Sequence, residues 1–239
     1  MQSGFILINK PVDWTSHDVV GYIRGIIRTS NLLEIKKPKV GHAGTLDPFA
    51  TGLLIVGIGR DATKRLDEFK EKKKEYIATI RLGATSDTYD KTGTIQEANS
   101  KTQTISKSHI LHVLEKFIGK QSQIPPMYSA KKVNGQKLYE LARKGIEIER
   151  QPCEIDIYEI ELLNMISSNE KESSDPQAIE IRISCSTGTY IRTLAHDIGQ
   201  QLGTGAYCEE LRRTKIGEYR VEDAHDVKDL NEKNIHSYI

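Results

Sequence analysis

The sequence predicts an α+β fold in which helices and loops flank a mixed, mainly antiparallel sheet. Segments with the two-residue period of strands and segments with the helical period both occur, but they do not alternate regularly along the chain. Regular alternation is typical of a doubly wound parallel sheet, so its absence favours the mixed sheet. We expect the 239 residues to form a single domain, 1–239, long enough to bury a sizeable core.

The first half of the chain begins with an apolar strand, Phe5–Ile8, and a helix that Ser16 can cap. An apolar run from Leu53 is typical of a buried strand, and Asp61 can cap a short helix after it. In the next strand, one face collects Tyr76, Ala78, Ile80 and Leu82. Between these elements, the charge of Lys36–Lys39 fits either a solvated face or a phosphate contact.

The second half begins with an amphipathic helix capped by Ser106. Strands are expected at 154–163 and 179–185, with a polar hairpin tip or mobile loop at 167–177 between them. A helix with Ile191, Leu194, Ile198 and Leu202 on one side ends at Gly203. The last expected elements are two short strands, 206–211 and 215–219, on either side of Arg212-Arg213.

Composition restricts the class of protein. The formal net charge is only +1, so any nucleic-acid surface must come from local clustering. The three cysteines have no metal-binding spacing and are expected as free thiols, and His109 and His112 are expected as a solvated pair rather than a metal site. No signal peptide or membrane-spanning run is visible, which favours a cytoplasmic protein.

The stretch from Gly41 to Leu54, GHAGTLDPFATGLL, has the strongest potential for a functional site. It contains three glycines and one proline, which favour a loop of one defined shape before the buried strand. Asp47 lies in the middle of this loop, where a carboxylate can serve as a positioned nucleophile or base. The alternative is that Asp47-Pro48 simply starts a turn.

A second stretch, about 120–152, concentrates positive charge among tyrosines. Its cations are Lys120, Lys131, Lys132, Lys137, Arg143, Lys144 and Arg150, against Glu140, Glu147 and Glu149. Such a patch suits an RNA backbone with unstacked bases, although a solvated helix face has the same composition.

Gly41–Leu54 closely resembles the signature loop of the TruB-type pseudouridine synthases. GTYIRT, LRR and PPMYSAKKVNGQKLYELAR resemble three further family motifs, and they occur in the family's order. The resemblance implies the pseudouridine synthase fold with an RNA-binding insertion. The implied activity is the isomerisation of uridine 55 in the T loop of tRNA, with tRNA held through its T arm.

The resemblance also implies roles for individual residues. Asp47 is the expected catalytic residue, and Arg192 is expected to pair with it beneath the flipped nucleoside. Tyr190 helps to hold the base, Leu211 packs near it, and Tyr76 stacks on it, although the residues alone leave Tyr76 open as a core aromatic. His42 is expected to contact neighbouring bases, and Lys64 is expected to contact phosphate or the substrate loop, or to be simply solvated.

The reaction breaks a bond to N1 and makes one to C5, without a redox step, and we expect no cofactor and no metal. An aspartic acid has an ordinary pKa of about 3.9 and is ionised at neutral pH without a general base. We expect a monomer with no obligate protein partner and without the PUA domain that usually follows in the family. Two alternatives stay open: a non-catalytic tRNA-binding or folding module, and a synthase that acts on another RNA.

Overall fold

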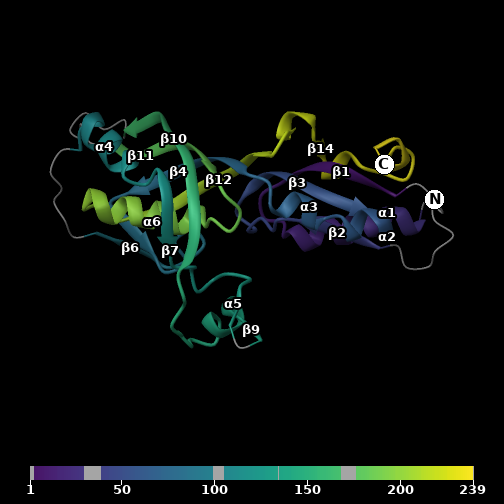
Figure 1. Cartoon of the computed structure of the whole chain (residues 1–239), viewed down its shortest axis with the longest axis horizontal. Coiled ribbons are helices and arrows are strands. Elements are labelled where there is room, and N and C mark those ends of the chain that lie inside the picture. Colours follow the sequence, from purple (N-terminus) through teal and green to yellow (C-terminus); the bar gives the residue numbers. More distant parts are fainter. Residues whose placement is uncertain (1–2, 30–38, 99–104, 134, 168–175, 239) are drawn as a thin grey trace. The chain divides into compact units, whose positions relative to one another are not determined.

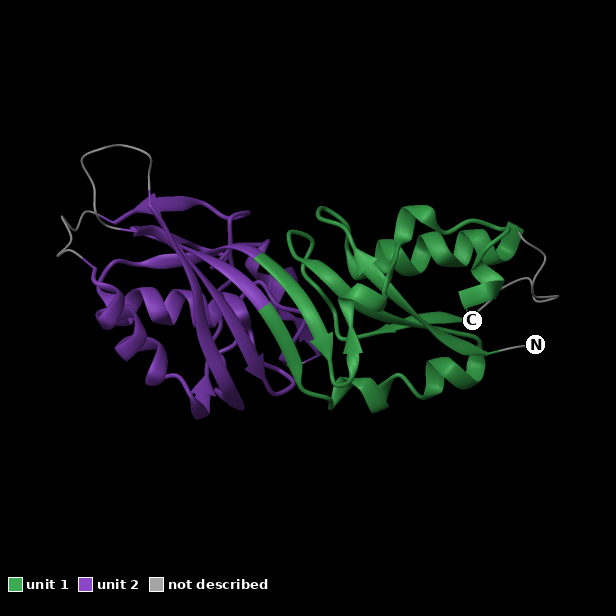
Figure 2. Ribbon diagram, turned by 90° about the horizontal axis from the view of Figure 1, so that it is seen from above, with its two compact units in different colours: residues 1–76, 211–239 green, residues 77–210 purple. Residues whose placement is uncertain are grey.

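The computed structural model describes residues 3–29, 39–98, 105–133, 135–167 and 176–238. The chain folds into two compact units, which Figure 2 colours separately. Unit 1 comprises residues 1–76 and 211–239, and unit 2 comprises residues 77–210. Two strands, β4 (Lys74–Leu82) and β12 (Ala206–Ile216), contribute residues to both units. That the two units act as one catalytic domain stays a prediction.

The sheet of unit 1 is built around β3 (Thr51–Ile58) (Figure 1). β1 (Gly4–Lys10) pairs antiparallel with the whole of β3, from Gly4 opposite Ile58 to Lys10 opposite Gly52. The other edge of β3 is shared: β2 (Val40–Ala43) pairs antiparallel with Ile55–Ile58, and β12 pairs parallel with Thr51 and Gly52. The short strands β13 (Tyr219–Arg220) and β14 (His225–Asp226) pair with β12 and β1. The sheet is therefore mixed.

Side chains from both faces of β3 are buried, which explains its continuous apolar sequence. Leu54, Val56 and Ile58 pack with α1 (Ser16–Thr29) in one cluster, and Leu53 and Ile55 belong to a second cluster with Phe69 and Ile216. The remaining helical segments of unit 1 are α2 (Arg60–Lys64), α3 (Asp67–Lys70) and the 3₁₀ turns η1 (Val221–Asp223), η2 (Val227–Asp229) and η3 (Ile235–Tyr238).

Two expected helix caps in unit 1 are wrong. Thr15 rather than Ser16 caps α1, because its hydroxyl accepts from Asp18 N at 3.0 Å while the Asp18 carboxylate accepts from Thr15 N at 2.8 Å. Asp61 does not cap α2; the hydroxyl of Ser3 accepts from Ala62 N instead, at 2.9 Å. The cap of α1 is a local pattern, Thr15 with Asp18 three residues later, whereas the cap of α2 depends on a contact with the distant Ser3 that the local pattern does not specify.

In unit 2, the strands follow the order β4, β11 (Pro176–Cys185), β10 (Cys153–Ser167) and β7 (Gly119–Gln123). The predicted alternation is confirmed in β4 and, from Ile179 to Cys185, in β11, where every second residue is buried. The helices α4 (Lys107–Glu115) and α6 (Ile191–Leu202) lie in this unit, and Ser106 caps α4 as expected. Its smaller elements are two strand pairs, β5 (Ala84–Ser86) with β6 (Ile95–Glu97) and β8 (Lys132–Val133) with β9 (Gln136–Lys137), and the helix α5 (Leu138–Ala142).

One expectation for the C-terminal strands is wrong. Residues 206–216 form the single strand β12, which does not break at Arg212-Arg213. The strand continues because the guanidinium of Arg213 is buried and donates to main-chain carbonyls within unit 1. Residues 36–38 and 168–175, where a charged run and a hairpin tip or mobile loop were expected, lie outside the described residues. Across the described ranges, no helix has the length and apolar character needed to cross a membrane.

Candidate active site

Residues 44–50, here called the Asp47 loop, connect β2 to β3 in unit 1. The buried side chain of Ser16 holds this loop, because its hydroxyl accepts from Leu46 N at 2.9 Å and lies 3.2 Å from Leu46 O, to which it donates. Asp13 N donates to Pro48 O at 2.8 Å. Ser16, expected as a helix cap, is therefore a support of the loop.

Lys10 supports the same loop from β1. Its side chain is fully buried on the face that also carries Ile6 and Ile8, and Nζ donates to the carbonyls of Pro11 at 2.8 Å, Trp14 at 2.6 Å and Pro48 at 3.3 Å. Burial lowers the pKa of Lys10 to about 8, although the nearby Asp47 and Asp13 carboxylates act in the opposite direction. A buried ammonium in this position joins the loop, at Pro48, to the carbonyls of Pro11 and Trp14.

Asp47 is half-buried, and its carbonyl accepts from Ala50 N at 3.1 Å in a tight turn. His42 lies in β2 just before the loop, with Nε2 3.1 Å from the Thr45 hydroxyl. Burial, followed by the neighbouring charges of His17 and Arg213, lowers the pKa of His42 to about 4. The imidazole of His42 is therefore neutral at physiological pH.

The three other candidate residues of unit 1 differ in exposure. Tyr76 in β4 and Leu211 in β12 are buried, with 9% and 7% of their surfaces exposed. Lys64 is exposed at the end of α2. Their predicted contacts with RNA stay predictions.

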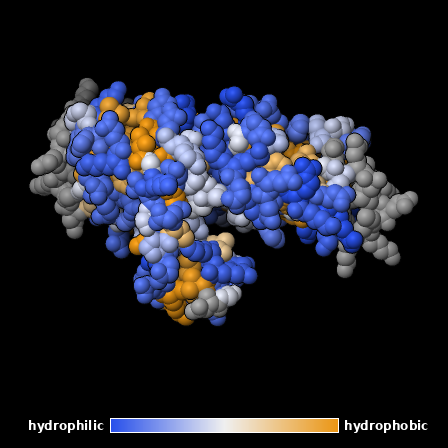
Figure 3. All heavy atoms as spheres, in the orientation of Figure 1, coloured by the Kyte–Doolittle hydropathy of each residue, from blue (hydrophilic) through white to orange (hydrophobic). Residues whose placement is uncertain are grey.

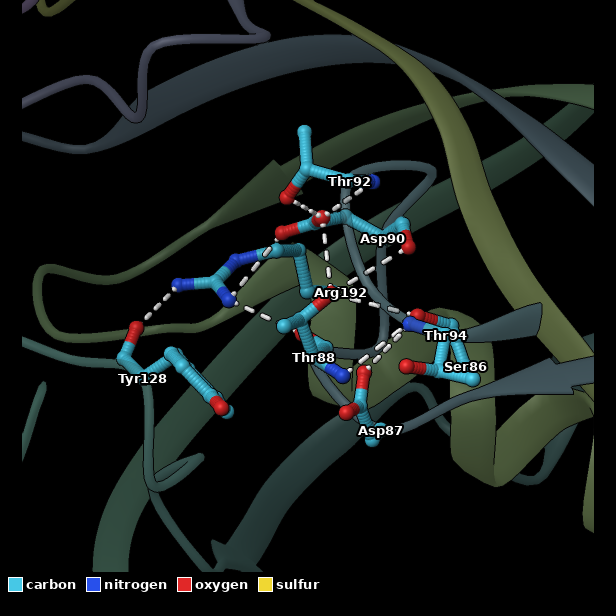
Figure 4. A network of polar contacts seen from close by, with 8 residues as sticks. All are labelled: Ser86, Asp87, Thr88, Asp90, Thr92, Thr94, Tyr128 and Arg192. Atoms are coloured by element: carbon cyan, nitrogen blue, oxygen red, sulfur yellow. Dashed lines mark hydrogen bonds and ion pairs between the residues drawn. The ribbon is translucent and has the colours of Figure 1, made fainter. Parts of the chain in front are cut away.

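In unit 2, Arg192 is the centre of a buried polar network (Figure 4). It is the second residue of α6, and its guanidinium donates to Thr88 O at 2.9 Å and to Tyr128 O at 2.8 Å. It also forms an ion pair with Asp90, at 3.2 Å between Nη1 and Oδ2, and the two side chains are only 4% and 5% exposed. We call Arg192, Asp90, Thr88, Thr92 and Tyr128 the Arg192 network.

The two carboxylate oxygens of Asp90 bind different partners. Oδ2 faces Arg192, and Oδ1 accepts from the Thr88 hydroxyl at 2.9 Å, from Thr92 N at 2.9 Å and from the Thr92 hydroxyl at 2.5 Å. Only glycine fits at position 93 of this turn, because a Cβ there would lie 2.1 Å from Asp87 Oδ1. The sequence thus builds a rigid turn that fixes the charge partner of Arg192.

Tyr190 precedes α6 and is half-buried. The side-chain amide of Gln123 binds its main chain from both sides, accepting from Tyr190 N at 2.9 Å and donating to Tyr190 O at 3.0 Å. The structure therefore places Tyr190 and Arg192 together in unit 2, and Asp47, His42, Lys64, Tyr76 and Leu211 in unit 1. The expected pairing of Asp47 with Arg192 joins the two units and stays a prediction.

The basic stretch is an insertion between the paired strands β7 and β10 of unit 2. β7 and β10 pair with Gln123 opposite Cys153, so residues 120–123 belong to the sheet and the insertion proper covers 124–152. Lys132, Arg143 and Lys144 are exposed on it, and the cations of Lys137 and Arg143 each lie 5.3 Å from the ring centre of Tyr139. Figure 3 shows a hydrophobic area on the segment that carries α5 and β9. Exposed apolar residues of the insertion include Ile124 and Ile146.

His109 and His112 are both exposed on α4, as expected for a solvated pair. Among the described residues, no group of three or more histidine, cysteine, aspartate or glutamate side chains is arranged to hold a metal ion.

Comparison with known proteins identifies the family. Residues 31–191 match the model of the TruB family pseudouridylate synthase N-terminal domain, and residues 192–237 match the tRNA pseudouridylate synthase B C-terminal domain. The chain belongs to the TruB family of pseudouridylate synthases. It is therefore an enzyme, and the α+β fold with a mixed sheet is confirmed.

Relatives match nearly the whole chain. The tRNA pseudouridine synthase B of Parabacteroides distasonis is 46% identical over 96% of this chain and 94% of its own length. The enzyme of the same name from Syntrophomonas wolfei is 45% identical over 96% of this chain and 72% of its own length. Among solved structures, a Cbf5–Nop10–Gar1 complex contains a similar chain, with a TM-score of 0.66 and 29% identity over 95% of this chain. This chain spans about half, 53%, of the length of that one.

Asp90, Lys10, Ser16 and Arg213 were not predicted as site residues of this TruB-family enzyme. Signals for two of them are present in the sequence. Lys10 continues the alternation of Ile6 and Ile8 and therefore points to the core, and Asp90 is the second of two acids in a turn-rich segment. The bonds of Ser16 and Arg213 run to residues 30 and 169 positions away, and no local pattern announces them.

Proposed function

We propose that this enzyme isomerises uridine to pseudouridine at position 55 in the T loop of tRNA, with Asp47 as the nucleophile. The main support is the set of relatives named tRNA pseudouridine synthase B, which match this chain at 46% identity over 96% of its length. The geometry of the Asp47 loop adds to this support, because Ser16 and Lys10 fix the main chain beside the carboxylate. Positioning of a reacting group can lower a barrier by about 7–11 kcal/mol.

In the proposed reaction, the Asp47 carboxylate adds to the nucleoside as the bond from C1′ to N1 breaks. The uracil turns, C1′ bonds to C5 as the carboxylate is released again, C5 loses its proton, and N1 gains one. Atoms and electrons balance without an oxidant. Flipping the uridine out of its loop costs a few kcal/mol, and stacking on Tyr76 returns about 1–3 kcal/mol.

Arg192 is proposed to orient the Asp47 carboxylate while Asp90 holds Arg192. A guanidinium has five N–H donors in a fixed plane, so it can serve two carboxylates at once. Tyr190 and Leu211 are proposed to hold the base. The neutral imidazole of His42 is proposed to contact the neighbouring bases, and Lys64 a phosphate.

The insertion is proposed to grip the T arm. Exposed Lys132, Arg143 and Lys144 suit the phosphates, and the aromatic and apolar side chains of the insertion suit unstacked bases. Binding should therefore weaken as salt rises.

The test is release of tritium from T-arm RNA labelled at uracil C5. Wild type should release label, and Asp47→Asn should release none while binding the RNA with similar affinity. Asp61→Asn is the matched control, because Asp61 is an exposed acid of the same unit and should leave release unchanged. Binding without release by wild type would indicate a non-catalytic module. Release only from another RNA would show that the substrate is not the T arm of tRNA. Release by Asp47→Asn would remove Asp47 from its proposed role.

A further inference from the structure

Arg213 is a buried cation whose hydrogen bonds all go to main-chain carbonyls. Only 1% of its surface is exposed, and within the described part of the chain no carboxylate forms an ion pair with it. Nε donates to Leu53 O at 2.8 Å, and Nη2 donates to Gly44 O at 2.8 Å. Burial of a charge is costly unless the charge is paired and hydrogen-bonded, so the two bonds that Arg213 makes indicate what it contributes.

The two acceptors lie at opposite ends of one segment. Gly44 is the first residue after β2, and Leu53 is the third residue of β3. The chain between them is the Asp47 loop and its entry into the strand. A single planar guanidinium therefore fixes the distance between the two ends of the loop.

The main chain of Arg213 meets the same segment. β12 pairs with β3 so that Arg213 lies opposite Gly52, and a Cβ at Gly52 would lie 2.3 Å from Arg213 O. Gly52 also has a φ of +102°, a conformation that suits glycine. At Gly44, where φ is +70°, a Cβ would lie 3.3 Å from Arg213 Nη1. Glycines at both ends thus allow Arg213 to approach the loop closely.

The strand that carries Arg213 also carries Leu211, two residues earlier and buried like Arg213. A movement of β12 relative to the Asp47 loop would change the position of Leu211 relative to Asp47. We call the contacts of Arg213 with Gly44, Gly52 and Leu53 the clamp. The clamp keeps the Asp47 loop and β12 in one arrangement, since it joins the side chain and the main chain of Arg213 to both ends of the loop.

We propose that Arg213 is a positioning residue for the reaction, which sets the Asp47 loop against the strand of Leu211 by clamping Gly44 and Leu53. This inference rests on the proposed role of Asp47. It predicts an effect on the rate of the chemical step and not on RNA binding, because the Arg213 side chain itself is buried.

The experiment compares Arg213→Met, Arg213→Lys and Lys74→Met in single-turnover tritium release, with RNA affinity and thermal unfolding measured in parallel. Lys74 is the matched control, since it is also a buried cation of unit 1 and donates to a main-chain carbonyl, that of Lys70 in α3. Arg213→Met should slow release about 100-fold at unchanged RNA affinity, the loss expected for a misplacement of about 1 Å. Arg213→Lys should lose less, and Lys74→Met should lower the unfolding temperature without slowing release.

Two further measurements keep the inference testable if Arg213→Met does not fold. Amide hydrogen exchange over residues 44–53 should accelerate in Arg213→Lys and not in Lys74→Met, whatever the substrate is. In a double-mutant cycle, Gly44→Ala and Arg213→Lys should have non-additive effects on the single-turnover rate, since both disturb one contact. Unchanged exchange, or a wild-type rate in Arg213→Lys, overturns the inference. An inactive wild type with accelerated exchange in Arg213→Lys refutes the proposed substrate and leaves the clamp.

Discussion

The Asp47 loop of unit 1 and the Arg192 network of unit 2 fix their central side chains in different ways. Lys10, Ser16 and Arg213 bind the loop through its main chain. Arg192 is fixed through its own guanidinium, by a carboxylate and two carbonyls. The difference fits the proposed roles: support through the main chain places a carboxylate that must react, whereas direct bonds hold a cation that keeps its charge throughout.

The largest expected effect breaks the network of unit 2. Asp90→Asn removes the carboxylate charge that faces Arg192 within unit 2, and breaking a buried ion pair by removing one partner costs about 3–5 kcal/mol. The free energy of unfolding in urea should fall by that amount.

Asp87→Asn is the matched control, because Asp87 is an exposed acid of the same turn whose Oδ1 accepts from Thr94 N at 2.8 Å. An asparagine oxygen can still accept this bond, so the change should stay within about 0.5 kcal/mol. Equal stability of the two variants would show that the ion pair of Asp90 contributes little.

A smaller effect tests the support of the loop in unit 1. Ser16→Ala removes both bonds to Leu46 and leaves its buried main-chain groups unsatisfied, at a cost of about 1–3 kcal/mol. Thr15→Ala, one residue earlier, removes a helix cap at a cost of about 0.5–2 kcal/mol.

The two variants should lose similar stability in thermal unfolding but differ in turnover. Release of tritium should slow in Ser16→Ala, because the loop beside Asp47 shifts, and should stay at the wild-type rate in Thr15→Ala. Equal rates in both variants would mean that Ser16 serves only the fold.

The fold was predictable where the burial of one face of a strand or helix determines the spacing of its apolar residues. Alternation in β4 and β11 and the helical period of α6 are confirmed, because burial of one face imposes that period. The expected break at Arg212-Arg213 is wrong. Two consecutive arginines suggest an exposed loop, because the sequence does not show that a distant carbonyl, that of Gly44, accepts from Arg213. The same reason explains the cap of α2, because Ser3 is distant in the sequence, whereas the pattern of Thr15 and Asp18 that caps α1 is already present locally.

The candidate site was predictable to the level of its motifs. Resemblance led to Asp47 and Arg192, and the structure places each on a rigid support within its own unit. The supports themselves were not predicted, because a lysine or serine in a motif carries no sign of which carbonyl it will bind. Lys10 is the exception, since strand alternation alone turns it toward the core.

A further expected effect concerns Lys10, a buried cation of unit 1, and depends on pH. Burial lowers the pKa of Lys10 to about 8 from the ordinary 10.5. Between these two values the unfolded chain binds more protons at Lys10 than the folded protein does. Stability contributed by this residue therefore rises with pH from about 8 to 10.5, and below about 8 the full cost of the buried charge remains.

Lys10→Met should remove this rise, which is measured as the difference between its urea midpoint and that of wild type at a series of pH values from about 8 to 10.5. Lys228→Met, which changes an exposed lysine of unit 1, should follow wild type. The neutral amine of Lys10 still has N–H donors, so the bond to Pro48 O survives deprotonation and the loop should keep its position. Parallel midpoints of wild type and Lys10→Met across the series would show that Lys10 titrates as an exposed lysine does, and that the loop of unit 1 is not held by a buried charge.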